Sequence, residues 1–358
     1  MKSPRVERLR ELLIERDLDT LIVNGAANLR YLSGFTGSSA IALVAADGQP
    51  RFFTDFRYQE QSAVEVDGAF GREILDGELL DGLAAALPPG RVGFDDATTS
   101  VADRARLEEH APSHTEFVAA GGLVEQLRAV KDAEEIERIA AAAALVDGVY
   151  EWLVQRGFAG RRERDVAIEL EHEMRMRGAS APSFGSIVAG GPHAALPHAQ
   201  VSDSPIVAGT LVTVDIGAVL DGYCSDCTRT FAIGEPTAQA REIYELVLAA
   251  QLAGLEALAP GLSGVAVDAK ARAVIEDAGY GEYFGHGLGH GVGLEIHEPP
   301  RLSRHASDEP LRAGNVVTVE PGIYLPGTLG VRIEDLVVLT DDGATRLSRF
   351  TKELLVVA

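Results

Sequence analysis

The stretch TLVTVDIGAVLDGYCSDCTRTFAI, residues 210–233, contains two runs rich in β-branched residues on either side of Asp221 and Gly222. An Asp-Gly pair between two such runs predicts a β-hairpin with a two-residue turn, because both central residues of that turn need positive φ. The turn sets the register of the two strands, with Leu220 opposite Tyr223.

Two aspartates fall on one face of this predicted hairpin. The register places Gly217 opposite Asp226 and Asp215 opposite Thr228, so the aspartates are diagonal neighbours about 7 to 8 Å apart at the backbone. Their carboxylates can then converge on metal ions, and Gly217 leaves space between them. The alternative is a solvated acidic face, since carboxylates are usually exposed, but the flanking apolar residues disfavour it.

The two cysteines of the chain, Cys224 and Cys227, form a CxxC motif in the second strand. Residues three apart in a strand point to opposite faces, and no second cysteine pair is present to complete a structural zinc site. We therefore expect ordinary strand side chains. The lack of a disulfide framework is typical of a reducing cytosol.

Length and charge argue against several classes of protein. A chain of 358 residues exceeds the usual single-domain size of about 100 to 200 residues, which favours two domains. The formal net charge of -22 argues against nucleic acid or an anionic membrane as a partner. Residues 1–17 have the pattern of an amphipathic helix and not of a signal peptide, and no apolar run approaches the ~18 residues of a membrane span. We expect a cytoplasmic protein.

Helix and strand patterns divide the chain near residue 125. Before it, helical patterns alternate with short strands in the manner of an α/β unit. These strands are expected at 20–24, 40–45, 51–55 and 91–95. After it, a long helix begins with Asp132 as N-cap and Glu135 in the first turn. We therefore expect domains at 1–125 and 126–358.

Two glutamates near the end of the chain lie in apolar surroundings. Glu320 ends the run NVVTVE, and Glu334 lies in GVRIEDLVVLT, within a strand expected near 331–339. A buried carboxylate needs a partner, because an unpaired buried charge is costly. For Glu334 the partner is either Arg332, two residues away on the same strand face, or a metal ion. A structural salt bridge is thus the alternative to a metal site.

The segment FGHGLGHGVG, residues 284–293, places His286 and His290 four residues apart among five glycines. The spacing matches a metal-binding helix, but each interior glycine costs a helix about 1 kcal/mol relative to alanine. An extended or irregular backbone is the better interpretation. Glycines let the main chain approach other groups closely, so this segment can present an imidazole to a filled site.

Together these residues resemble the pita-bread metallopeptidases, the family of methionine aminopeptidase, aminopeptidase P and prolidase. The resemblance covers roughly residues 130–358, while SGFTGSSA and FFTDFRYQEQ are similar to the smaller domain of the proline-specific branch. It implies an α+β fold, with a C-terminal pita-bread (creatinase/aminopeptidase) domain and a smaller N-terminal creatinase-like α/β domain. It also implies five ligands for two divalent metal ions per chain: Asp215, Asp226, His290, Glu320 and Glu334.

The resemblance implies further roles within the site. Glu320 would shuttle a proton as well as bind metal, while His198 and His297 would contact the scissile carbonyl. Manganese is expected first, and cobalt, zinc or iron are also compatible with oxygen and imidazole ligands. A homodimer is implied as well. Three residues are expected to contact the substrate: His286, Arg332 and Arg301.

The resemblance to the proline-specific branch, which PHAALPHA at 192–199 supports, implies hydrolysis of the bond before a proline in a peptide. We expect an Xaa-Pro aminopeptidase acting on peptides with proline second, with an Xaa-Pro dipeptidase (prolidase) as the alternative. A dipeptidase needs a cation for the free carboxylate of proline, and Arg301 or Arg304 could provide it. A binding protein of this fold and a creatinase-like hydrolase are disfavoured, because all five ligands are present.

Overall fold

The computed structural model describes residues 3–357, and the chain divides into two compact units between Arg128 and Ala129. Residues 1 and 2, at the start of the predicted N-terminal helix, lie outside the described residues. Among residues 3–357 we find no helix with the length and hydropathy of a membrane span. Each unit has its own sheets and its own hydrophobic core.

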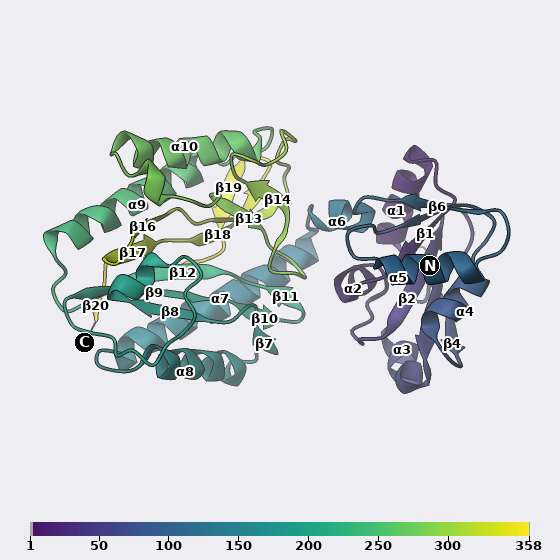
Figure 1. Cartoon of the computed structure of the whole chain (residues 1–358), viewed down its shortest axis with the longest axis horizontal. Helices are drawn as coiled ribbons and strands as arrows, with labels where there is room; N and C mark the ends of the chain where they lie inside the picture. The colour runs from purple at the N-terminus through teal and green to yellow at the C-terminus, as the bar shows by residue number, and fades with distance from the viewer. Residues whose placement is uncertain (1–2, 358) are drawn as a thin grey trace. The chain divides into compact units, whose positions relative to one another are not determined.

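The N-terminal unit is built on one six-stranded sheet (Figure 1). Its strands are β1 (Thr20–Val23), β2 (Ala40–Ala45), β3 (Arg51–Asp55), β4 (Gly71–Leu75), β5 (Gly90–Phe94) and β6 (Thr115–Ala119). They lie in the order β4-β3-β2-β1-β5-β6, and only β2 runs antiparallel to its neighbours. The helices are α1 (Pro4–Glu15), α2 (Ala26–Ser33), α3 (Gln59–Glu65), α4 (Leu79–Ala85), α5 (Val101–His110) and α6 (Leu123–Arg128).

The four strands predicted for this unit correspond to β1, β2, β3 and β5, whereas the two edge strands were not predicted. The sequences of β4 and β6, GREIL and TEFVA, include charged residues, and neither strand contains a fully buried residue. An edge strand is partly solvated, so it lacks the apolar run by which a central strand is recognised.

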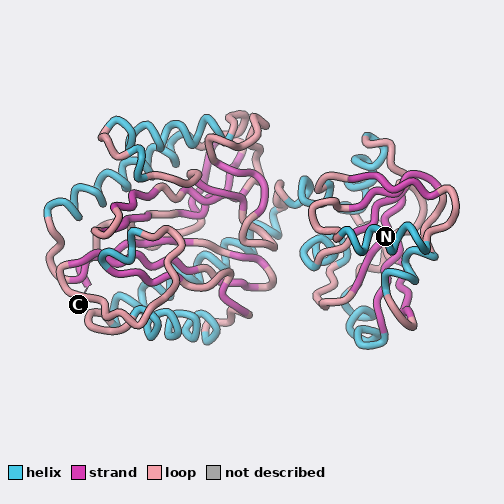
Figure 2. Tube along the Cα trace, in the orientation of Figure 1, coloured by secondary structure: helices cyan, strands magenta, loops and turns pink. Residues whose placement is uncertain are grey.

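The C-terminal unit has its strands between two pairs of helices, as Figures 1 and 2 show. The helices are α7 (Ala133–Arg156), α8 (Glu163–Met176), α9 (Ala238–Ala257) and α10 (Gly264–Asp277). The strands are β7 (Ala181–Pro182), β8 (Ile187–Gly190), β9 (Thr210–Ile216), β10 (Ala218–Leu220), β11 (Tyr223–Cys224), β12 (Cys227–Ile233), β13 (Gly289–Gly291), β14 (Glu298–Leu302), β15 (Val316–Val319), β16 (Gly322–Leu325), β17 (Leu329–Arg332), β18 (Asp335–Thr340), β19 (Gly343–Arg346) and β20 (Val356–Val357).

Two hydrophobic clusters hold these layers together. One joins α9 and α10 to β15, β16, β17 and β18, and the other joins α7 and α8 to β8, β9 and β12. The strands form four sheets, in the orders β20-β12-β9-β8, β14-β13-β15-β18-β19, β11-β10-β7 and β16-β17. Strands from different sheets therefore meet inside this unit, where the predicted site residues lie.

The predicted hairpin and its register are confirmed. Asp215 on β9 pairs with Thr228 on β12, and the pairing continues through β10 and β11 to the turn. Asp221 and Gly222 have φ of 46° and 79°, as the two-residue turn requires. Asp215 and Asp226 consequently share one face of the hairpin.

Gly217 has a different role from the one we expected. A Cβ atom at this position would lie 2.1 Å from the carbonyl oxygen of Ser225 and 2.9 Å from the ring of Phe184. The missing side chain therefore allows close backbone approach within the hairpin, and it does not leave open space beside Asp226.

Two other sequence predictions for this unit are confirmed. The Asp132 carboxylate accepts a hydrogen bond from the Glu135 amide at 3.0 Å, and the Glu135 carboxylate accepts one from the Asp132 amide at 3.0 Å. This capping box starts α7. Cys224 and Cys227 are both free and buried, and they belong to different hydrophobic clusters. They are ordinary strand side chains.

Candidate metal centre

A hollow of about 460 Å³ in the C-terminal unit is lined by side chains from several separate segments. All five residues implied as metal ligands line it: Asp215 on β9, Asp226 just before β12, His290 on β13, Glu320 just after β15, and Glu334 between β17 and β18. We call these five residues the ligand cluster. Five further predicted site residues also line the hollow: His198, His286, His297, Arg301 and Arg332.

The ligand cluster is compact. Each of Asp215, Asp226 and Glu334 offers a carboxylate oxygen, and these atoms all lie within 4.8 Å of one another. The Nε2 atom of His290 lies 3.5 Å from Asp226 Oδ2 and 3.3 Å from Glu320 Oε1. The hairpin thus brings two carboxylates together, and three distant segments add the remaining ligands.

In the absence of metal ions, the ionised forms of several carboxylates in this cluster are disfavoured. Burial, followed by repulsion from the neighbouring acids, raises the pKa of Asp226 and of Glu334 well above the ordinary carboxyl range. Burial also raises the pKa of Glu320. Several buried anions at this separation need compensating positive charge, because both desolvation and mutual repulsion disfavour the ionised forms.

Two buried oxygens of the cluster have no hydrogen-bond partner: Asp215 Oδ1 and Glu334 Oε1. The other oxygen of each carboxylate is bonded, since Arg332 donates to Asp215 Oδ2 and Thr228 donates to Glu334 Oε2, both at 2.7 Å. Buried oxygens that accept no hydrogen bond are suited to coordinating a cation. Oxygen and imidazole donors in this number fit divalent metal ions.

The imidazole of His290 is oriented as a ligand. Its Nδ1 lies 3.1 Å from the carbonyl oxygen of Gly291, so Nδ1 carries the hydrogen and the lone pair of Nε2 faces Asp226 and Glu320. The predicted extended backbone is confirmed, since His290 lies on β13. A Cβ at the neighbouring Gly289 would lie 2.0 Å from the Thr318 carbonyl oxygen. Glycine is therefore required there for β13 to lie this close to β15.

Arg332 is not the partner of Glu334, contrary to the first of our two alternatives. The strand expected near 331–339 is interrupted, because β17 ends at Arg332 and β18 begins at Asp335. Ile333 and Glu334 lie in the connection between the two sheets. Arg332 is 4% exposed, and its guanidinium donates to Asp215 Oδ2, to the Thr228 and Tyr324 hydroxyls and to the Pro197 carbonyl.

The other predicted histidines surround the cluster. His286 lies against Tyr324, whose hydroxyl is 2.9 Å from His286 Nε2. The ring of His297 meets that of His290 edge to face, with centroids 4.3 Å apart. Desolvation, with nearby imidazoles and Arg301, lowers the pKa of His297 to about 4, so this ring is neutral near pH 7. His198 and Arg301 are exposed at the rim.

Several contributors to the site were missed by sequence reasoning, chiefly Thr228, Tyr324, Gln200 and His305. For Thr228 a signal existed, because the register places it opposite Asp215 and on the face of Asp226. Gln200 directly follows the segment 192–199 and Tyr324 lies four residues after Glu320, whereas His305 lies near no residue that the sequence marked except Arg301 and Arg304.

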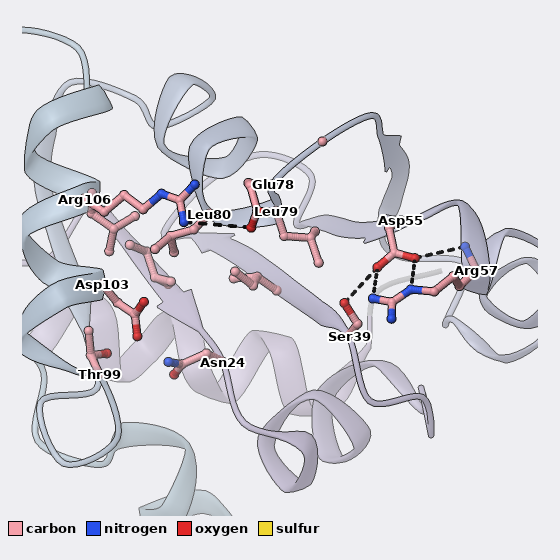
Figure 3. A pocket seen from close by; sticks show the side chains of 14 residues that line it. Asn24, Ser39, Asp55, Arg57, Glu78, Leu79, Leu80, Thr99, Asp103 and Arg106 are labelled. Carbon is pink, nitrogen blue, oxygen red and sulfur yellow. Dashed lines mark hydrogen bonds and ion pairs between the residues drawn. The ribbon is translucent and has the colours of Figure 1, made fainter.

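The N-terminal unit contains a second hollow, of about 410 Å³, which Figure 3 shows. Its arginines are already paired with acids. Arg57 donates to both oxygens of Asp55 at 2.8 and 2.9 Å, and Arg106 donates to both oxygens of Asp81 at 2.5 and 2.8 Å. Buried carboxylate oxygens without a hydrogen-bond partner occur, among the described residues, only in the ligand cluster. The C-terminal hollow is therefore the candidate site.

Removal of divalent ions is expected to make the free energy of unfolding fall as the pH rises above the ordinary carboxyl range of about 4. The folded-state pKa of Asp226 and of Glu334 is raised, so protonation stabilises the metal-free fold and that stability is lost as the pH rises through the folded-state pKa. Thermal unfolding over a pH series measures the effect. Asp226→Asn should make the free energy of unfolding depend less on pH. Added Mn²⁺ should stabilise the wild type and so oppose the decrease at higher pH. An Asp226→Asn variant with the same pH dependence as the metal-free wild type would contradict the prediction.

Residues 137–341 match the model of metallopeptidase family M24, and residues 5–130 match that of the creatinase/prolidase N-terminal domain. The chain belongs to metallopeptidase family M24. The predicted family and the predicted two-part α+β fold are thereby confirmed.

Similar proteins are found over almost the whole length of the chain. The structure of an Xaa-Pro dipeptidase from Bacillus anthracis has 39% sequence identity and a TM-score of 0.95, and 99% of each chain is covered. An Xaa-Pro dipeptidase of Pyrococcus furiosus is 37% identical over 355 residues, which cover 98% of this chain and 99% of that protein. The structure of an X-Pro aminopeptidase from Thermotoga maritima has 36% identity and a TM-score of 0.88, with 96% and 99% of the two chains covered.

Proposed function

We propose that this protein is an Xaa-Pro dipeptidase that hydrolyses dipeptides with a C-terminal proline. The ligand cluster, in which two buried carboxylate oxygens have no hydrogen-bond partner, is the observation that supports metal-dependent hydrolysis. The relatives support the dipeptidase alternative better than the aminopeptidase that we expected first. Xaa-Pro aminopeptidase remains the second candidate, because the structure from Thermotoga maritima is also similar.

We infer that the ligand cluster holds two divalent ions, with Mn²⁺ expected first and Co²⁺, Zn²⁺ or Fe²⁺ as alternatives. When bound, these ions supply Lewis-acid activation of water and of the scissile carbonyl. The remaining steps belong to side chains of this protein, which bind the substrate, orient it and transfer protons.

Glu320 is the group that moves the proton. Its side chain is 17% exposed and lies 3.3 Å from His290 Nε2, and its Oε1 accepts a hydrogen bond from Thr318 at 3.0 Å. Its carboxylate lines the hollow and can take a proton from the attacking water and hold it. It then delivers that proton to the nitrogen of the leaving proline, which cannot depart as an anion.

The histidines at the rim act on the substrate itself. His297 is neutral at pH 7, because its pKa lies near 4, so one ring nitrogen can donate a hydrogen bond to the scissile carbonyl oxygen. His198, exposed at the rim, is the second group that we assign to this oxygen. His286, held by the Tyr324 hydroxyl at 2.9 Å, forms a wall for the proline ring. Proline has no amide hydrogen to pair as a strand, so a shaped wall must recognise it.

Arg301 is the cation that we assign to the free carboxylate of a dipeptide. It lies opposite His290 in the pairing of β13 with β14, lines the hollow and is exposed. An exposed guanidinium beside the metal ligands can bind a carboxylate with two parallel hydrogen bonds. A longer peptide has an amide at this point and gains no such pair.

Cleavage of Xaa-Pro is expected to exceed cleavage of Xaa-Pro-Xaa and of longer peptides, and Arg301→Ala should raise KM for the dipeptide about tenfold or more. That is the scale for one hydrogen bond to a charged group. Arg304→Ala is the matched control, because Arg304 is exposed on the same segment but does not line the hollow. Steady-state kinetics with Mn²⁺ measures both effects. Efficient cleavage of the longer peptides, with KM unaffected in Arg301→Ala, would favour the aminopeptidase instead.

A further inference from the structure

We propose that Thr228 is a positioning residue that selects which oxygen of Glu334 faces the ligand cluster, and so determines how tightly the site holds divalent ions. The inference rests on the proposed function, since it takes Glu334 as a metal ligand. It goes further by assigning a task to a hydroxyl that is not itself a member of the ligand cluster.

The hydroxyl of Thr228 has both of its partners within the site. Thr228 is completely buried on β12, and its Oγ1 accepts a hydrogen bond from Arg332 Nε at 3.0 Å. The same oxygen donates to Glu334 Oε2 at 2.7 Å. A guanidinium can only donate, so the contact with Arg332 leaves the hydroxyl hydrogen for Glu334. The direction of both hydrogen bonds is therefore determined.

This arrangement leaves one oxygen of each of two carboxylates unbonded. Thr228 donates a hydrogen bond to Glu334 Oε2, and Arg332 donates one to Asp215 Oδ2, both at 2.7 Å. The oxygens without a partner are Glu334 Oε1 and Asp215 Oδ1, both of them buried. Arg332 and Thr228 thus each bond one oxygen of a ligand carboxylate and leave the other oxygen available to a metal ion. Neighbouring groups that orient metal ligands in this way commonly control metal affinity.

The backbone of Thr228 also contributes. Its carbonyl oxygen accepts a hydrogen bond from the Glu334 amide at 3.1 Å. This contact holds the connection between β17 and β18 beside β12, independently of the Thr228 side chain. A substitution that removes only the hydroxyl therefore leaves Glu334 nearby but frees its carboxylate to rotate.

Thr230 provides a matched control for a purely structural role. It lies two residues further along β12, on the same face, and is 1% exposed. Its hydroxyl donates to the Arg332 carbonyl oxygen at 2.9 Å and lies 3.1 Å from Thr213 Oγ1. It bonds no carboxylate of the ligand cluster. Loss of either hydroxyl should lower stability, but only loss of the Thr228 hydroxyl should change metal binding.

The experiment titrates Mn²⁺ alone into the metal-free full chain by isothermal titration calorimetry, with thermal unfolding measured in parallel. Thr228→Val should weaken the binding of at least one Mn²⁺ ion about 10- to 100-fold, the usual scale for losing a group that orients a metal ligand. Thr228→Ser, which retains the hydroxyl, should restore tight binding. Thr230→Val should bind Mn²⁺ like the wild type. If Thr228→Val does not fold, Thr228→Ala removes the hydroxyl without adding an apolar branch.

Each possible result has a distinct meaning. Wild-type affinity in the Thr228 variants that lack the hydroxyl would overturn the inference, and so would an equal loss in Thr230→Val. Failure of the serine variant to restore binding would also count against it. A wild-type chain that takes up no Mn²⁺ would instead overturn the proposed function, so the two failures are distinguishable.

Discussion

Replacement of Glu320 by glutamine is expected to lower kcat for Xaa-Pro hydrolysis by at least about 10²-fold, the scale on which general acid-base catalysis contributes. Glutamine has nearly the same size and can still accept the hydrogen bond that Thr318 donates to Oε1 at 3.0 Å. It cannot carry a proton from water to the proline nitrogen. It also removes one of the charges that hold divalent ions beside His290. Steady-state kinetics with saturating Mn²⁺ measures kcat and KM separately.

The fold should survive this change, because neighbouring strands and not Glu320 hold the surrounding backbone together. Thermal unfolding checks that point. Glu309→Gln is the matched control, since it removes the same charge from an exposed position that does not line the hollow. Its kcat should stay close to that of the wild type. A Glu320→Gln enzyme with near wild-type kcat would remove Glu320 from the mechanism.

Removal of divalent ions is expected to abolish hydrolysis, and re-addition of Mn²⁺ is expected to restore it. The physical reason is the charge of the site. Three buried carboxylates lie together with that of Glu320, and among the described residues that line the hollow the buried cation is Arg332, which is bonded to Asp215. Without ions there is no Lewis acid to activate water. Exhaustive chelation followed by separate additions of Mn²⁺, Co²⁺, Zn²⁺ and Fe²⁺ measures the effect and ranks the metals.

Asp226→Asn distinguishes a role in the site from a general effect of chelation. This variant lacks a carboxylate in the middle of the ligand cluster, so its activity should not return at the Mn²⁺ concentration that restores the wild type. Activity that persists in the wild type after exhaustive chelation would contradict the metal-dependent mechanism.

The sequence predicted most of the parts that depend on local patterns. The Asp-Gly turn determined the register of β9 and β12, and with it the pairing of Asp215 with Thr228. The glycines around His290 indicated an extended segment, because a helix could not tolerate them. The N-cap at Asp132 was recognisable from a single turn of helix. Each of these features is decided by residues that are neighbours in the sequence.

The parts that were missed depend on contacts between distant segments. We considered Arg332 as a partner of Glu334, because a continuous strand would place them on one face. The chain instead changes sheets at that point, and Arg332 reaches Asp215, which is 117 residues away in the sequence. Thr228 had a register position but no motif that marked it as a partner of Glu334. The edge strands β4 and β6 lack an apolar run.

The preferred length of the peptide is not determined by the motifs of the sequence. Under the proposed function, the ligand cluster and the rim histidines serve the bond before proline in either activity. We expect the difference to lie in how the site binds the group that follows proline, for which we assign Arg301. The relatives, and not a local pattern, shift our proposal from aminopeptidase to dipeptidase.

The most direct test of the central claim is a crystal structure of the Mn²⁺-loaded full chain, measured at a wavelength where manganese scatters anomalously. We predict two anomalous peaks in the C-terminal hollow, coordinated by Asp215, Asp226, His290, Glu320 and Glu334. Glu334 Oε1 and Asp215 Oδ1, the oxygens that accept no hydrogen bond, should be among the coordinating atoms. The absence of anomalous density among these five residues, or two manganese ions bound elsewhere, would contradict the account.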